Sequence, residues 1–257
     1  MWDAVKEGIF QFLVLIESFA GDWGLAIVIL TAIFRLVVWP LTIKQTKSAL
    51  EMQKFQPRIK EIQNKYADDK EKQQEELLKF YQEHKVNPFG GCLPMILQMP
   101  IFIALYQVLG GTPKVPGLMG QYFADNGIVG TFYGLIPNLL VTPKAGFADG
   151  ALVAIPYVIL LVLFGLSIWL PQALMPGEKS QKMIGLYMGV FMLFVGWSVP
   201  AGVLLYWDVS ALVGLAQQRL TQRALRLADE NAAGEIVVDT PEVTSKKSKK
   251  TKGKGSN

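Results

Sequence analysis

Long apolar blocks separated by charged stretches dominate the pattern of this chain. Five segments are apolar enough to be interpreted as membrane spans: 23–43, 92–110, 151–170, 183–198 and 201–217. The last two come from one apolar block that is too long for a single span, and Pro200 and Gly202 interrupt it. The pattern therefore predicts an all-α polytopic membrane protein with five transmembrane helices.

The segments between these blocks predict four further kinds of structure. Residues 1–22 place apolar side chains three or four positions apart among charged ones, which predicts an amphipathic helix lying on the membrane surface. Residues 44–91 hold two such apolar runs around Asp68 and Asp69, which favours an antiparallel helical hairpin, and Pro57 should kink its first arm or start a helix. The remaining segments are an outer loop, a short inner loop and a basic tail that we expect to be disordered after Asp229: 111–150, 171–182 and 218–257.

The distribution of Lys and Arg predicts the orientation. If the N-terminus lies outside, the inner segments hold ten, two and nine Lys or Arg residues, whereas the outer segments hold only Lys6, Lys114 and Lys144. Short loops rich in Lys and Arg stay in the cytoplasm. The hairpin and the tail are therefore predicted to be cytoplasmic, and the N-terminus extracytoplasmic.

Composition and motifs exclude several function classes. Cys92 is the single cysteine, so an internal disulfide and a cysteine-based metal site are both excluded, and a packing role is favoured. The N-terminus lacks the basic region and cleavage site of a signal peptide. The chain also lacks a GxxxxGK[ST] loop and an HExxH motif. We expect no enzyme activity, no metal and no cofactor.

Arg35 decides the functional interpretation, because it lies about a dozen residues into the first predicted span. A cation near the bilayer centre costs about 2.5–3.5 kcal/mol on insertion scales. Its side chain could reach the cytoplasmic interface, pair with Asp208 in the last span, or line a hydrated cavity that attracts a charged substrate. The third interpretation is favoured, and it is compatible with the second. Other polar residues in the spans, such as Gln98 and Ser210, more often serve helix packing.

Four sequence motifs resemble one known family. They are RLVVWPLTIKQ from Arg35, MQKFQPRIKEIQNKY from Met52, NPFGGCLPMILQMPIFIALY from Asn87 and PAGVLLYW from Pro200. In this order and over residues 24 to 218, they resemble the YidC-type membrane protein insertases of the YidC/Oxa/Alb family. Here the chain departs from the family pattern at Asp208, where a neutral residue is usual. It also has no large extracytoplasmic domain before the first core helix, which suggests a minimal form.

The resemblance implies a hydrophilic groove, open to the cytoplasm and to lipid, that accepts client helices and releases them laterally into the bilayer. It implies the following groove residues: Arg35, Asp208, Gln98, Trp207 and Ser210. It assigns recruitment by the cytoplasmic hairpin to Met52, Phe55, Pro57 and Tyr66. Asp208 could neutralise Arg35, which would weaken a positively charged groove.

Partners and location follow from the same resemblance. The expected partners are nascent membrane protein clients, the lipid bilayer, a ribosome and a larger translocon, and the expected location is a bacterial plasma membrane. The tail lysines could contact either ribosomal RNA, which is favoured, or anionic lipid: Lys246, Lys247, Lys249, Lys250, Lys252 and Lys254. Two alternatives to an insertase are a small-molecule anion transporter or channel that uses Arg35, and an assembly factor that chaperones helices already inserted.

Overall fold

The computed structural model describes residues 1–84, 93–112, 115–174 and 179–238. Apart from one pair of two-residue strands, its regular elements are helices. Their bounds are α1 (Trp2–Ala20), α2 (Trp23–Lys65), α3 (Lys70–Glu83), α4 (Leu93–Leu109), β1 (Gly111–Thr112), β2 (Val115–Pro116), α5 (Leu118–Asn126), α6 (Pro143–Ala148), α7 (Ala151–Leu174), α8 (Lys179–Gly196) and α9 (Ala201–Val238). The strands β1 and β2 pair antiparallel.

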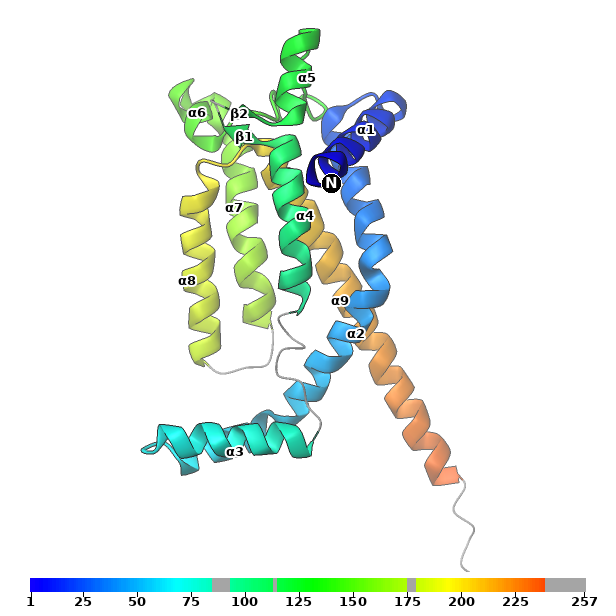
Figure 1. Cartoon of the computed structure of the whole chain (residues 1–257), viewed down its shortest axis with the longest axis vertical. Helices are drawn as coiled ribbons and strands as arrows, with labels where there is room; N and C mark the ends of the chain where they lie inside the picture. The colour runs from blue at the N-terminus through cyan, green and yellow to red at the C-terminus, as the bar shows by residue number, and fades with distance from the viewer. Residues whose placement is uncertain (85–92, 113–114, 175–178, 239–257) are drawn as a thin grey trace, which may run out of the picture.

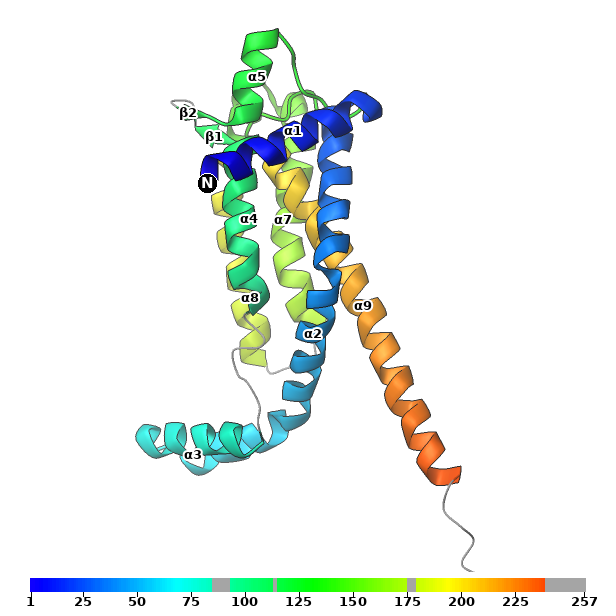
Figure 2. The ribbon, with the colours of Figure 1, turned by 45° about the vertical axis from the view of Figure 1, so that its right-hand side comes forward.

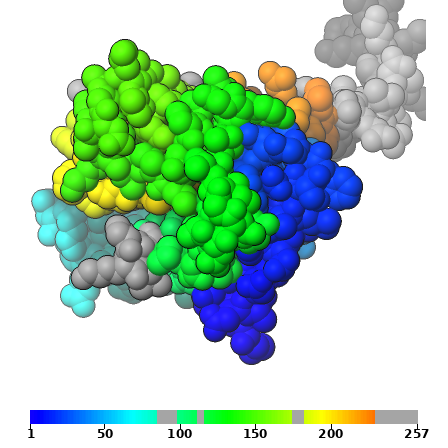
Figure 3. All heavy atoms as spheres, turned by 90° about the horizontal axis from the view of Figure 1, so that it is seen from above, coloured from blue at the N-terminus to red at the C-terminus, as the bar shows by residue number. Residues whose placement is uncertain are grey.

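The helices α2, α4, α7, α8 and α9 form a bundle, with the other elements at its two ends (Figure 1). Helix α9 lies against both α2 and α7, and α7 also packs along α8. Helices α1, α5 and α6 lie at one end, whereas α3 lies beyond the opposite end (Figures 1 and 2). From above, α1 and the segment that carries α5 adjoin over the bundle (Figure 3).

Two of the described helices are long and apolar enough to cross a membrane, namely Trp23–Lys65 and Ala151–Ala173. Two shorter apolar helical stretches, Gln98–Leu109 and Lys182–Gly196, accompany them. Their apolar side chains face outward in large number, as in α8, where Phe191 and Phe194 are exposed. Side chains exposed in this way match a lipid environment better than water.

The helix boundaries differ from the predicted ones at two places. Helix α2 continues through Pro40 and Pro57 without a break, so the first span and the first arm of the predicted hairpin are one helix. Helix α9 continues to Val238, whereas the sequence predicted an end near residue 217 and disorder after Asp229. That prediction does not hold for residues 230–238, which continue the helix although Gly234, Val237 and Val238 are poor helix formers. Residues 239–257 lie outside the described residues.

Helix α1 buries only part of its apolar surface in the protein. Phe10, Leu13 and Ile16 are buried in the hydrophobic core, while Phe12 and Phe19 are exposed. The sequence predicted only an amphipathic helix that lies on the membrane surface. The structure buries part of its apolar side chains, because α1 packs against α2 and α4 along one side.

Asp22 connects the start of α2 to the outer loop. Its Oδ1 atom accepts a hydrogen bond from the backbone N–H of Leu25 at 2.8 Å, which caps α2. Its Oδ2 atom accepts a second bond from the N–H of Tyr133 at 2.9 Å. The loop approaches so closely that a Cβ atom on Gly24 would lie 2.3 Å from Cβ of Phe132. One buried carboxylate therefore sets where the loop meets the bundle.

We predict that Asp22→Ala lowers the free energy of unfolding by about 2–3 kcal/mol, because it removes a cap and leaves a loop N–H unpaired. Asp69→Ala is the matched control, since Asp69 caps α3 through the N–H of Lys72 in an exposed position. Its loss should be about 1 kcal/mol or less. Thermal unfolding in detergent measures both variants, and equal losses would contradict the connecting role of Asp22.

Candidate functional site

The side chain of Arg35 lies between α2 and α9. Its Nε atom donates a hydrogen bond to Oγ of Ser210 at 2.8 Å. A Cβ atom built on Gly214 would lie 2.9 Å from Nη1 of Arg35, so the guanidinium rests directly on the backbone of α9. Arg35 itself is half-buried. The cation is therefore neither enclosed by apolar side chains nor fully exposed.

Two further hydrogen bonds join α2 to α9 beyond Arg35. Nε2 of Gln217 donates to the backbone carbonyl of Arg35 at 3.0 Å, and Nε1 of Trp39 donates to Oγ1 of Thr221 at 3.4 Å. Gln217 and Thr221 are buried, and they follow Ser210 at spacings that keep all three on one face of α9. This polar face of α9 is the main feature of the α2–α9 contact.

Tyr206 extends the hydrogen bonds to a third helix. Nε2 of Gln98, on α4, donates to the Tyr206 hydroxyl at 2.7 Å. Ser210 follows Tyr206 by one turn of α9, on the same face. Tyr206 and Ser210 thus bind Gln98 of α4 and Arg35 of α2 from neighbouring turns of α9. Sequence reasoning did not select Tyr206, although its position four residues before Ser210 is the signal that could have identified it.

Trp207 points to a different surface of α9 and takes part in aromatic packing. Its ring lies 5.3 Å from that of Phe102 on α4, at 90°, and 5.4 Å from that of Phe164 on α7, at 81°. Such edge-to-face pairs stabilise a helix interface beyond the area that they bury. The structure thus places this predicted groove residue at the junction of α4, α7 and α9.

Asp208 does not meet Arg35. Residues two positions apart on a helix differ by about 200° in direction, so Asp208 points away from the face that carries Ser210. Both of its carboxylate oxygens are buried without a hydrogen-bond partner among the described residues. In this part of the chain, the partner of the Arg35 side chain is Ser210, and no ion pair with Asp208 forms.

The residues predicted for recruitment lie where α3 packs against the last turns of α2. The Phe55 ring contacts the Phe80 ring edge-to-face at 5.6 Å, and the Phe80 ring lies 4.2 Å from that of His84. Tyr66 lies under the ammonium groups of Lys65 and Lys72, at 5.2 and 5.7 Å. Phe55 therefore holds the two helices together, and Tyr66 marks the turn between them.

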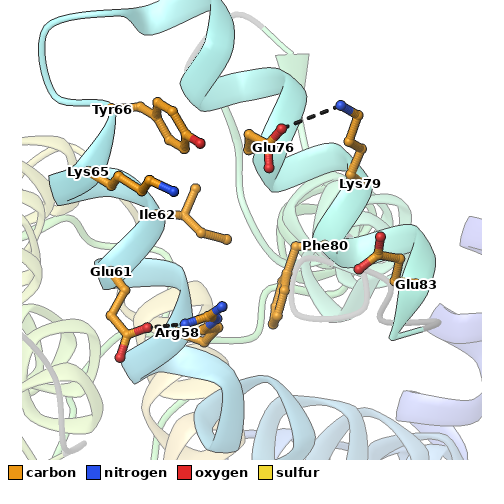
Figure 4. A pocket seen from close by; sticks show the side chains of 9 residues that line it. All are labelled: Arg58, Glu61, Ile62, Lys65, Tyr66, Glu76, Lys79, Phe80 and Glu83. Carbon is orange, nitrogen blue, oxygen red and sulfur yellow. Dashed lines mark hydrogen bonds and ion pairs between the residues drawn. The ribbon is translucent and has the colours of Figure 1, made fainter.

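A cleft of about 260 Å³ opens between these two helices (Figure 4). Arg58 pairs with Glu61 on one side, and Lys79 pairs with Glu76 at 3.4 Å on the other. Phe80 and Ile62 form the apolar part of its lining. Its cations are offset by neighbouring carboxylates, so charge alone does not select an anionic partner here. Lys246–Lys254, in the predicted tail, lie outside the described residues.

The features above are those of an all-helical protein that holds a half-buried, hydrogen-bonded arginine between two of its helices. The 60Kd inner membrane protein family matches residues 15–229, and the chain belongs to this family. The resemblance inferred from the four motifs is thereby confirmed.

Known relatives agree with this assignment. The chain is 35% identical over 225 residues to a membrane protein insertase YidC of Haemophilus influenzae and 33% identical over 231 residues to that of Cellvibrio japonicus. These matches cover 86% and 89% of this chain but 37% of each relative. A crystal structure described as active YidC insertase superimposes with a TM-score of 0.64 at 30% identity, over 84% of this chain and 46% of the other.

We predict that Asp208→Leu stabilises the protein, because it removes a buried carboxylate whose oxygens have no partner and fills the space with an apolar side chain. The expected gain in the free energy of unfolding is about 1–3 kcal/mol. Thermal unfolding in detergent measures it, with Asp125→Leu on the exposed end of α5 as the control. A destabilised Asp208→Leu would mean that this carboxylate has a favourable partner.

Proposed function

We propose that this protein is a membrane protein insertase that accepts client helices at Arg35 and releases them into lipid. The observation that carries the proposal is the half-buried guanidinium of Arg35, held by Ser210 inside a bundle of apolar helices. The relatives named insertases support it, and the family membership favours it over an anion transporter or channel. The function requires no cofactor and no covalent chemistry.

The proposed topology has five spans, formed by the first part of α2, α4, α7, α8 and the first part of α9. The hairpin of α2 and α3 and the basic C-terminal segment lie in the cytoplasm of a bacterial cell, and α1 lies outside. The excess of Lys and Arg in the proposed inner segments supports this orientation. Helices α4 and α8 are short, and short spans thin the surrounding bilayer, which lowers the barrier to a polar segment.

The proposed mechanism uses the charge of Arg35. In a groove that is open to water from the cytoplasmic side, the guanidinium attracts an acidic client tail, since one hydrogen bond to Ser210 leaves its other N–H groups for the client. The hydrophobic helix of the client then moves sideways into lipid. Burial of that helix supplies the free energy, so ATP is not needed.

We predict that the purified protein, reconstituted alone in liposomes, inserts a single-span client with a short acidic N-terminal tail. Arg35→Ala should reduce insertion about tenfold, which is equivalent to about 1.4 kcal/mol of lost attraction. Arg35→Lys should retain insertion, because a positive charge at this position is sufficient. Protection of the translocated tail from external protease measures insertion.

Arg219→Ala is the matched control, since Arg219 is an exposed arginine of α9. Insertion that is unaffected by Arg35→Ala would overturn the mechanism. Equal damage from Arg35→Lys and Arg35→Ala would replace charge attraction with a geometric role of the guanidinium. Solute flux without insertion would support the transporter, and folding of pre-inserted helices without insertion would support an assembly factor.

We also propose that the C-terminal lysines recruit the translating ribosome. Six lysines lie between residues 246 and 254, and such a cluster attracts the phosphates of RNA through counterion release. Deletion of residues 245–257 should weaken ribosome binding about tenfold or more at low salt, and the difference should shrink as salt rises. Replacement of the six lysines by glutamine controls for chain length. If the deletion instead weakened binding to anionic vesicles only, lipid would be the partner.

A further inference from the structure

The contact between Arg35 and Gly214 is close over the whole guanidinium group. A Cβ atom on Gly214 would lie 2.9 Å from Nη1, 3.1 Å from Cζ and 3.3 Å from Nη2 of Arg35. Because three atoms of one planar group are this close to a single point, the plane of the guanidinium lies across Gly214. A methyl group at this position would press on the guanidinium, which would have to shift by a few tenths of an ångström.

The conformation of the backbone does not explain the glycine. Gly214 lies well inside α9, and its φ angle is not among the positive values found at Gly21, Gly127, Gly134 and Gly150. Alanine is a better helix former than glycine in such a position. The residue therefore weakens α9 locally, and the space it leaves for Arg35 is its evident structural consequence.

Residues on either side of Gly214 fix the rest of Arg35. Ser210, one turn earlier on α9, accepts the hydrogen bond from Nε, and Gln217, one turn later, binds the backbone carbonyl. The arginine is thus held at its side chain and at its backbone, with Gly214 between these two contacts. Added bulk at Gly214 therefore displaces the guanidinium from α9 by a few tenths of an ångström, while these two contacts hold the rest of the residue.

We propose that Gly214 is a positioning residue that sets the depth and direction of the Arg35 guanidinium, and so the strength with which an acidic client tail is attracted. This inference rests on the proposed function and deepens it. Gly214 does not touch the client. It acts through Arg35, by leaving room for the planar group to lie flat on α9 with its outer N–H groups toward the client.

The test compares Gly214→Ala with Gly8→Ala in the liposome assay. Gly8 is also a helical glycine, but a Cβ atom there meets nothing within 4 Å. Two clients are used that differ only in an acidic or a neutral N-terminal tail. Because the charge of Arg35 is kept and the guanidinium is only displaced, Gly214→Ala should reduce insertion of the acidic-tail client about threefold, less than Arg35→Ala does, and leave that of the neutral-tail client unchanged. Gly8→Ala should change neither.

A general defect of α2–α9 packing would give a different result. It would reduce insertion of both clients alike and would lower the midpoint of thermal unfolding. Either outcome overturns the inference. Full activity of Gly214→Ala would overturn it as well. The double variant Gly214→Ala/Arg35→Lys gives a second test. The compact ammonium of lysine has no plane to displace, so this variant should insert as well as Arg35→Lys alone. A further loss in the double variant would also overturn the inference.

The failure of the proposed function is distinguishable from the failure of this inference. If Arg35→Ala inserts both clients as well as the unchanged protein does, the proposed role of Arg35 is wrong. If Arg35→Ala is impaired for the acidic-tail client and Gly214→Ala is not, only the positioning role of Gly214 is wrong.

Discussion

The hydrogen bond from Arg35 to Ser210 is the interaction on which the central part of this structure depends. A cation between apolar helices is costly to hold, and hydrogen bonding together with partial exposure lowers that cost. The bond is compatible with a single rotation of α9 about its axis, in which Ser210, Gln217 and Thr221 lie toward α2. Once that rotation is set, Trp207 faces α4 and α7, and Asp208 faces away from the cation.

The two ends of the bundle are built from different chemistry. At the end that carries α1 and α5, the hydrophobic core includes Leu13, Trp23 and Phe123, and Asp22 attaches the outer loop to the start of α2. Toward α3, the contacts between α2 and α9 include hydrogen bonds of Arg35 and Trp39. Apolar packing excludes water, whereas a polar contact tolerates it. This difference is what the proposed mechanism uses, since it requires water to reach the cation from one side only.

Much of the fold and part of the site could be predicted from the sequence. Apolar periodicity located the helices, and a cation in an apolar block marked Arg35 before any contact was known. Prediction failed where neighbouring elements decide the outcome. The family resemblance placed Asp208, Trp207 and Ser210 together in one groove. In the structure these three residues lie on different faces of α9 and have different surroundings. Gly214 and Gln217 were missed, because an apolar block gives no local signal for the side of the helix that meets a polar partner.

The sequence by itself determined the all-helical architecture, the family and the position of the cation along α2, because these follow from local composition and from motifs in order. Only the tertiary structure decided which residues surround that cation. The partner of Arg35 is 175 residues away along the chain, and helix rotation chose Ser210 over Asp208. Rotation depends on the summed packing of α2, α4 and α7 against α9, and no single segment of the chain contains that information.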